Sequence, residues 1–181
     1  LTAAMYRYHM AAKAYVKAGG DVVTDGNGIV VEQIVIRDGM SSAVVAAGTQ
    51  LEAGVTELVL SADPMESKAQ VELADNETLT SLDVHVAGIA KDNVVPVIVT
   101  LDQLAPEALN QGNIALYHVE NGETVKMTRV YTIEEVDEHN EYYYDIITGT
   151  VTVAMSSFSE VAVASDDSKA WEGKFDYSWY N

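Results

Sequence analysis

The 181-residue sequence contains no cysteine, few basic residues, only 3 prolines and only 2 residues each of tryptophan and phenylalanine. Without cysteine it has no disulfide bond, thiolate nucleophile, zinc–thiolate site or iron–sulfur cluster. Its 10 Lys and Arg face 28 Asp and Glu, which gives a formal net charge of −18. A surface this acidic repels phosphate backbones and anionic lipid headgroups. We therefore expect no nucleic-acid partner and no membrane insertion of this segment.

Hydrophobic residues make up 48% of the sequence, which is enough to build a core and is not the composition of a disordered chain. The sequence starts at Leu1 rather than methionine, and its first residues do not have the pattern of a signal peptide or a membrane-spanning segment. Residues 175–181 alternate aromatic and polar side chains, as a strand does. We expect the chain to be part of a larger protein.

The first 18 residues differ in composition from the rest. They include six alanines and three basic residues, and every Asp and Glu of the sequence follows them. This composition favours a short N-terminal helix or linker over residues 1–18. We expect a main module over 19–165, with two small sub-sandwiches divided near 102–112 as an alternative. Residues 166–181 are expected to form a C-terminal strand or linker that leads to a further domain.

From residue 22 onward the hydrophobic period is two, and glycine-containing turns separate short runs of β-branched residues. This pattern predicts a mostly all-β chain, an antiparallel β-sandwich with a short N-terminal helix. The turn at 25–28, Asp-Gly-Asn-Gly, is a strong signal of this kind. Helical signals are weak beyond the N-terminus, at 104–109 and 132–139. The predicted strands are 29–36, 42–45, 55–61, 70–73, 81–86, 94–101, 113–119, 124–130, 141–145, 150–154 and 158–164.

The four histidines, at positions 9, 85, 118 and 139, do not come in pairs with the spacing of metal ligands. His85 alternates with Asp83 on one face of the predicted strand 81–86, and His118 lies two residues before Glu120, so each histidine has a possible carboxylate partner. We expect ordinary core or surface histidines, no metal site and no cofactor.

Acidic clusters at 21–27, 75–77, 134–138 and 166–167 are the candidates for calcium, which prefers carboxylate and carbonyl oxygens. None has the spacing of an EF-hand loop with its terminal glutamate. We therefore predict that added calcium leaves the melting temperature nearly unchanged in a thermal shift assay. A saturable upward shift of several degrees would show instead that one of these clusters binds the ion.

Three consecutive tyrosines, Tyr142, Tyr143 and Tyr144, are the candidate ligand-binding residues. Exposed aromatic rings on a strand could stack on sugars, whereas buried rings would form cross-strand pairs in the core. Because side chains alternate along a strand, the middle tyrosine is expected to point away from its two neighbours. A carbohydrate- or calcium-binding module is thus one alternative function.

Two stretches resemble a known family. In residues 39–58 a β-branched run is followed by Val45-Ala46-Ala47-Gly48, then Leu51 and a second run. This order resembles the opening of the ZU-type β-sandwich domain, whose usual pattern is a strand, Ile-Pro-Ala-Gly and a leucine, then another strand. Ala46 stands where the family has proline. The resemblance implies a β-sandwich fold.

Residues 144–163 resemble the closing hairpin of secreted surface modules in Gram-positive anaerobic bacteria, and 169–180 are similar to segments that precede GLUG-type repeats. In some ZU-type relatives a His-Phe-Ser tripeptide in this hairpin cleaves itself, the serine hydroxyl attacking the phenylalanine carbonyl with the histidine as base. Here the tripeptide is Ser157-Phe158-Ser159, so the nucleophile is retained and the base position holds a hydroxyl. The resemblance therefore implies a tripeptide that does not cleave.

We interpret the chain as a non-catalytic structural or interaction module of a bacterial surface or secreted protein, located extracellularly, with a protein or glycan partner. It is not expected to be an enzyme. A self-processing domain that has lost the base of its tripeptide is a second alternative to this function. A Lys–Asn isopeptide crosslink from Lys126 is a further covalent possibility in a cysteine-free module.

Overall fold

The computed structural model describes residues 22–75, 77–100 and 114–166. These residues are mostly β, as the hydrophobic period predicts, and no α-helix is found among them. A short 3-10 helix, η2 (Ile133–Glu135), precedes the ninth strand. The strands are β1 (Ile34–Asp38), β2 (Ser41–Val45), β3 (Val59–Met65), β4 (Glu77–Ala87), β5 (Val95–Thr100), β6 (Ile114–Glu120), β7 (Glu123–Lys126), β8 (Thr128–Val130), β9 (Glu141–Asp145), β10 (Thr150–Met155) and β11 (Glu160–Asp166).

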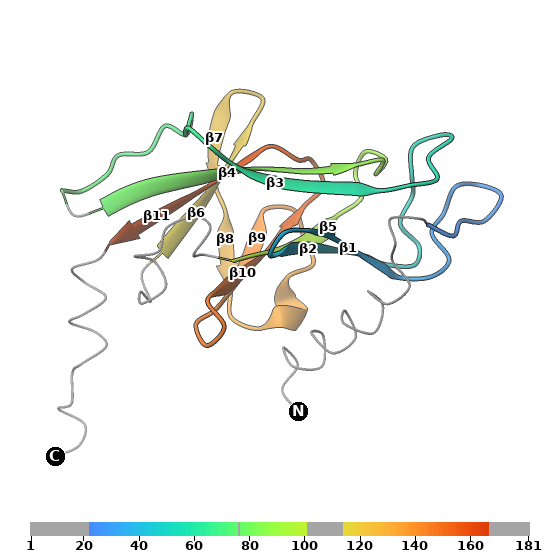
Figure 1. Cartoon of the computed structure of the whole chain (residues 1–181). Coiled ribbons are helices and arrows are strands. Elements are labelled where there is room, and N and C mark those ends of the chain that lie inside the picture. Colours follow the sequence, from blue (N-terminus) through green and yellow to red (C-terminus); the bar gives the residue numbers. More distant parts are fainter. Residues whose placement is uncertain (1–21, 76, 101–113, 167–181) are drawn as a thin grey trace, which may run out of the picture.

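The strands form two sheets (Figure 1). The six-stranded sheet has the order β1-β2-β5-β10-β9-β8, and the five-stranded sheet has the order β3-β4-β11-β6-β7. All pairs are antiparallel except β8 with β9, which is parallel. Each sheet contains strands from both sides of residues 101–113, through the pairs β5 with β10 and β4 with β11. The two halves of the chain therefore share both sheets.

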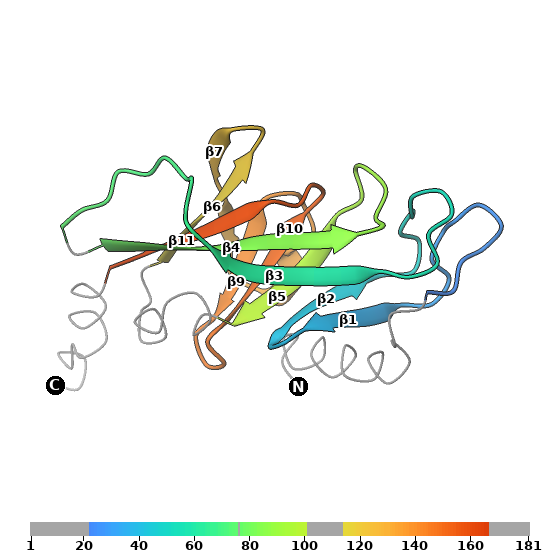
Figure 2. The ribbon, with the colours of Figure 1, turned by 45° about the horizontal axis from the view of Figure 1, so that its top comes forward.

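One hydrophobic cluster includes residues of both sheets. Figure 2 shows β3 and β4 in one layer and β1 and β2 in another. Alternate residues of most strands enter the cluster, for example Val97 of β5 and Val84 of β4, both fully buried. β10 is buried on both faces because a smaller cluster, with Val136 and Ala154, covers its other side. The chain after η2 is thus packed against β10.

Several predicted strands differ from the observed ones, among them 55–61, of which only residues 59–61 lie in a strand, β3. The run 29–36 is paired as a strand only from Ile34, while residues 29 and 30 make isolated bridges with Gln50 and Thr24. Residues 70–73 are not a strand. The run 124–130 is divided at Met127, a buried residue at which the chain leaves β7 in one sheet and enters β8 in the other. Hydrophobic period alone does not reveal which sheet a strand joins.

The turn at 25–28 and the proline in β5 can be followed residue by residue. Asp25 Oδ1 accepts the N–H groups of Asn27 and Ile29, at 2.8 and 3.0 Å, which confirms the turn at 25–28. Pro96 lies near the start of β5, inside the sheet order. On one side of β5, β2 pairs only with residues 97 and 98, and on the other side Pro96 lies opposite Ala154 of β10.

The expected N-terminal helix at 1–18, the helical signal at 104–109 and the segment 167–181 lie outside the described residues. Within the described part of the chain, no helix is long and apolar enough to cross a membrane.

Candidate functional site: a histidine, glutamate and serine cluster

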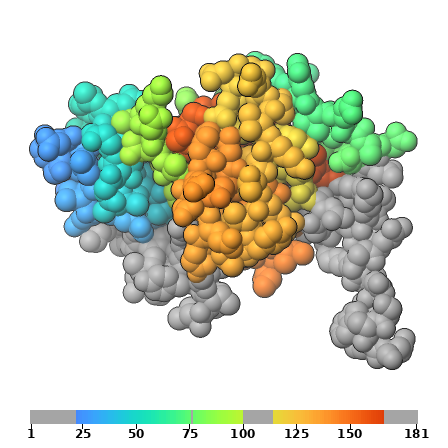
Figure 3. Space-filling view, turned by 180° about the vertical axis from the view of Figure 1, so that it is seen from behind, coloured from blue at the N-terminus to red at the C-terminus, as the bar shows by residue number. Residues whose placement is uncertain are grey.

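Polar side chains from three separate segments meet at one end of β6. His118 and Glu120 lie two residues apart on β6 and so share one face of the strand. His139 and Asn140 come from the segment between η2 and β9, and Ser159 comes from the connection between β10 and β11. These segments meet because β11 pairs with β6 and because the Asn140 N–H donates to the Ala154 carbonyl of β10, at 2.8 Å. In Figure 3 the part of the chain from β6 to β9, coloured yellow and orange, occupies the centre of one face.

His118 is the most buried member of the cluster, with a side chain that is 0% exposed. Its Nε2 is 2.8 Å from Ser159 Oγ, and its Nδ1 is 2.6 Å from Asn140 Oδ1. Burial lowers the pKa of His118, although the contacts with Asn140 and Glu120 act in the opposite direction. We therefore treat His118 as a neutral imidazole near pH 7.

Glu120 is the charged centre of the cluster. Its Oε1 accepts a hydrogen bond from the Ser157 hydroxyl at 2.6 Å and contacts His139 Nε2 at 2.7 Å. Its Oε2 accepts from the Asn140 amide at 2.9 Å. Partial burial raises the pKa of Glu120, but the hydrogen bonds from Ser157, Asn140 and His139 and the nearby His118 outweigh burial and bring it to about 2. Glu120 is thus ionised and acts only as an acceptor at neutral pH.

His139 has its tautomer fixed by the backbone. The Ser156 N–H donates to His139 Nδ1 at 2.9 Å, so this nitrogen carries a lone pair. A neutral His139 must then hold its hydrogen on Nε2, where it donates to Glu120. The two imidazole rings of His118 and His139 meet edge to face, with centroids 5.6 Å apart.

The tripeptide Ser157-Phe158-Ser159 lies in the connection between β10 and β11. Phe158 packs against the main hydrophobic cluster and contacts the His85 ring, with centroids 6.3 Å apart. The family pattern places the base at residue 157, whereas the structure places His118, from β6, beside the Ser159 hydroxyl. A histidine next to the serine is therefore present, supplied by a different strand.

The three tyrosines alternate as expected on β9. Tyr142 and Tyr144 are buried, 3% and 4% exposed, and belong to the main core, whereas Tyr143 packs on the other side of the sheet against the smaller cluster. Burial raises the pKa of all three phenols. Two of the three candidate sugar-stacking rings thus lie inside the protein.

Lys126, the candidate for an isopeptide bond, is exposed on β7. Such a crosslink needs a buried amine, and the position of Lys126 does not provide one.

The contact between His139 and Glu120 has no sequence signal, because 19 residues and two strands separate them. Only the spacing of His118 and Glu120 was visible in the sequence, and the structure places His118 Nδ1 3.7 Å from Glu120 Oε1.

Comparison of the chain with protein-family models, curated proteins and solved structures gives no match. The resemblance to ZU-type modules therefore rests on the two short stretches of sequence alone.

Proposed function

We propose that the chain is an antiparallel β-sandwich that serves as a non-catalytic structural or interaction module of a larger secreted or cell-surface protein. Two sheets with a common hydrophobic cluster support the sandwich. The formal charge of −18 supports a well-solvated surface that is offered to a protein or glycan partner.

One observation carries the non-catalytic part of this proposal. The Ser159 hydroxyl donates its single hydrogen to the Val119 carbonyl oxygen, in the shortest contact that the serine makes. The contact between Ser159 and His118 Nε2 then needs its hydrogen from the imidazole. A ring nitrogen that already carries hydrogen cannot accept the serine proton, so Ser159 is held as an acceptor and not activated as a nucleophile.

A second candidate function is self-processing, which the 2.8 Å contact between Ser159 and His118 favours. It requires the other tautomer, with the His118 hydrogen on Nδ1 facing Asn140 and a lone pair on Nε2. Ser159 Oγ would attack the Phe158 carbonyl carbon while its proton passes through His118 to the Ser159 nitrogen. The C–N bond would break, an ester would form, and water would then hydrolyse the ester.

We predict that the purified chain remains a single polypeptide, because the hydroxyl hydrogen of Ser159 is directed at Val119. Intact mass and a denaturing gel after several days at neutral pH test this. Two fragments divided between Phe158 and Ser159 would establish self-processing instead, provided that Ser159→Ala prevents their formation. Ser157→Ala is the matched control, since Ser157 contacts Glu120 and not His118.

A further inference from the structure

We propose that His118, Glu120 and His139 form a binding site for a divalent transition-metal ion of the Zn²⁺ class. One ligand atom from each of the three residues lies within 4.8 Å of the others. In a tetrahedral zinc site, bonds of about 2.0–2.1 Å place neighbouring ligand atoms about 3.4 Å apart. The distances from Glu120 Oε1, 2.7 Å to His139 Nε2 and 3.7 Å to His118 Nδ1, lie on either side of this value. Small side-chain adjustments would therefore close the site around an ion.

A count of hydrogens around His118 points to a missing positive charge. Four contacts run in a row: Val119 carbonyl to Ser159, Ser159 to His118, His118 to Asn140, and Asn140 to Glu120. Each contact is a hydrogen bond only if one hydrogen lies between its two atoms, so the four contacts need four hydrogens. Ser159 supplies one, a neutral His118 supplies one, and Asn140 supplies one to either side. Three hydrogens thus serve four contacts.

Rotating the Asn140 amide does not remove this deficit. In the present orientation its oxygen faces His118 Nδ1 at 2.6 Å, and its nitrogen donates to Glu120 at 2.9 Å. In the reversed orientation the amide nitrogen would donate to His118, and the amide oxygen would face the ionised carboxylate. Either way two acceptors meet without a hydrogen while Ser159 donates to Val119. An additional cation, either a proton or a metal ion, resolves the contact.

The donor set favours a metal ion with affinity for imidazole. Two histidine nitrogens and one carboxylate are suited to Zn²⁺, Co²⁺ or Ni²⁺, whereas Ca²⁺ and Mg²⁺ prefer sites made of oxygen atoms. With Nδ1 of His118 on the ion, its Nε2–H would donate to Ser159, which donates in turn to the Val119 carbonyl. Such a hydrogen-bonded partner behind the ring orients ligand histidines in metal sites.

His139 is the ligand that must rearrange. To bind an ion through Nε2 its hydrogen moves to Nδ1, which now accepts the Ser156 N–H at 2.9 Å. That backbone contact would open when the ion binds. Because His139 is 31% exposed at the edge of the cluster, its ring has room to adjust, in contrast to the fully buried His118.

The test begins with the unmodified chain after removal of metal with a chelator. Co²⁺ is added and visible absorption is recorded, because Co²⁺ in a tetrahedral site absorbs visible light much more strongly than the hydrated ion does. Zn²⁺ should displace Co²⁺ and raise the melting temperature saturably at a stoichiometry of one ion per chain. Absence of the absorption bands together with no thermal shift at about 1 mM Zn²⁺ would overturn the proposal.

A variant locates the site. His139→Gln should weaken Zn²⁺ binding by roughly tenfold or more in a calorimetric titration, since it removes one ligand. His85→Gln is the control, because His85 is exposed on β4 and lies outside the cluster. If His139→Gln and His85→Gln lost equal Zn²⁺ affinity, the assignment of His139 as a metal ligand would be wrong. Circular dichroism checks that both are folded, and the titration is independent of whether the chain cleaves itself.

Discussion

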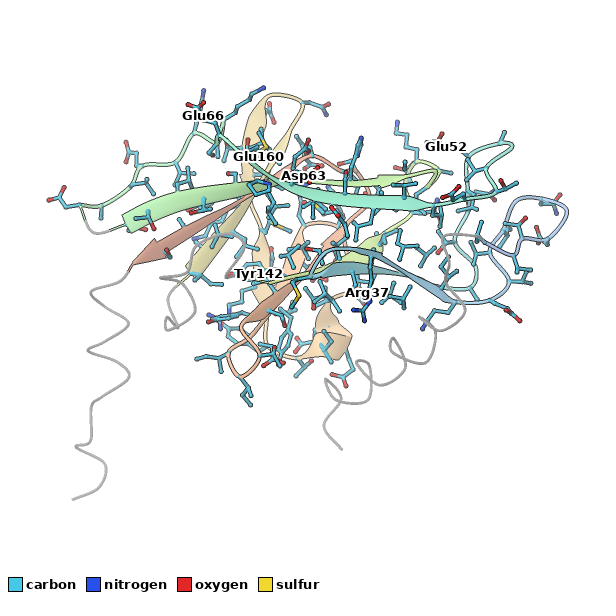
Figure 4. The ribbon with its side chains drawn as sticks, in the orientation of Figure 1. Arg37, Glu52, Asp63, Glu66, Tyr142 and Glu160 are labelled. Atoms are coloured by element: carbon cyan, nitrogen blue, oxygen red, sulfur yellow. The ribbon has the colours of Figure 1, made fainter. Side chains whose placement is uncertain are left out.

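Replacing Glu160 with alanine is expected to lower the free energy of unfolding by about 3 kcal/mol at neutral pH, as measured by urea denaturation. Glu160 lies on β11 and is only 4% exposed (Figure 4). Its carboxylate accepts hydrogen bonds from the hydroxyls of Ser67 and Ser81, each at 2.6 Å, and from the Lys68 N–H at 2.9 Å. Alanine would leave these donors without their acceptor and would release the segment at residues 67–69 from the sheet.

The Glu160 carboxylate also makes the free energy of unfolding depend on pH. Burial raises the pKa of Glu160, but the hydrogen bonds from Ser67, Ser81 and the backbone outweigh it, so the net pKa is lower than its ordinary value of 4.5. The folded state therefore binds this proton less readily than the unfolded state does. The contribution to stability is complete above about pH 4.5 and is lost as the pH falls through the folded pKa.

A comparison of variants isolates the Glu160 contribution. Glu160→Ala should lose less stability relative to the unmodified chain at about pH 3 than at about pH 7, because below about pH 4.5 the unfolded state takes up a proton that the folded carboxylate binds less readily. Glu52→Gln, at an exposed position, should follow the unmodified chain at both pH values. If Glu160→Ala costs less than about 0.5 kcal/mol at neutral pH, the carboxylate does not hold the segment in place.

Replacing Gly88 with alanine is the second change with a large expected effect, a loss of about 3 kcal/mol of unfolding free energy. Gly88 follows β4 and has φ of +104°, a backbone conformation that side chains disfavour. An added Cβ would lie 2.8 Å from Leu58 Cδ2 and 2.9 Å from Val55 Cγ1. Strain and overpacking therefore act together at this position.

Variants at two other glycines separate the effect of backbone strain from that of overpacking. Gly48 has φ of +95°, but a Cβ added there would meet nothing within 4 Å, so Gly48→Ala should cost only the backbone strain, about 1–2 kcal/mol. At Gly26 an added Cβ also meets nothing within 4 Å and no left-handed φ is present, so Gly26→Ala should be nearly neutral. Thermal or urea unfolding that ranks Gly88 with Gly26 would contradict the packing argument.

Several features of the fold were predictable because they depend on neighbouring residues. Alternation along 141–145 correctly indicated that Tyr143 points away from Tyr142 and Tyr144. The turn at 25–28 follows from its Asp and Gly residues. The break at Met127 was not predictable, since 124–130 has the period of a single strand and only the competition between two sheets divides it.

The candidate site was even less predictable from the sequence than the strands were. His118 and Glu120 were recognisable as possible partners because they lie two residues apart, and the structure places both on β6. His139, Asn140 and Ser159 join them only because β11 pairs with β6 and the segment before β9 is anchored to β10. The neighbours of Ser159 along the chain gave no indication of His118, which lies 41 residues away.

By itself the sequence determined the β-rich class, the acidic surface and the absence of thiol chemistry, because composition and a period of two are local properties. Tertiary structure alone decided which strands share a sheet, that Tyr142 and Tyr144 are core residues, and that two histidines meet at one carboxylate. These outcomes depend on pairing between distant segments, which is set by the packing of the whole core and not by any single stretch of the chain.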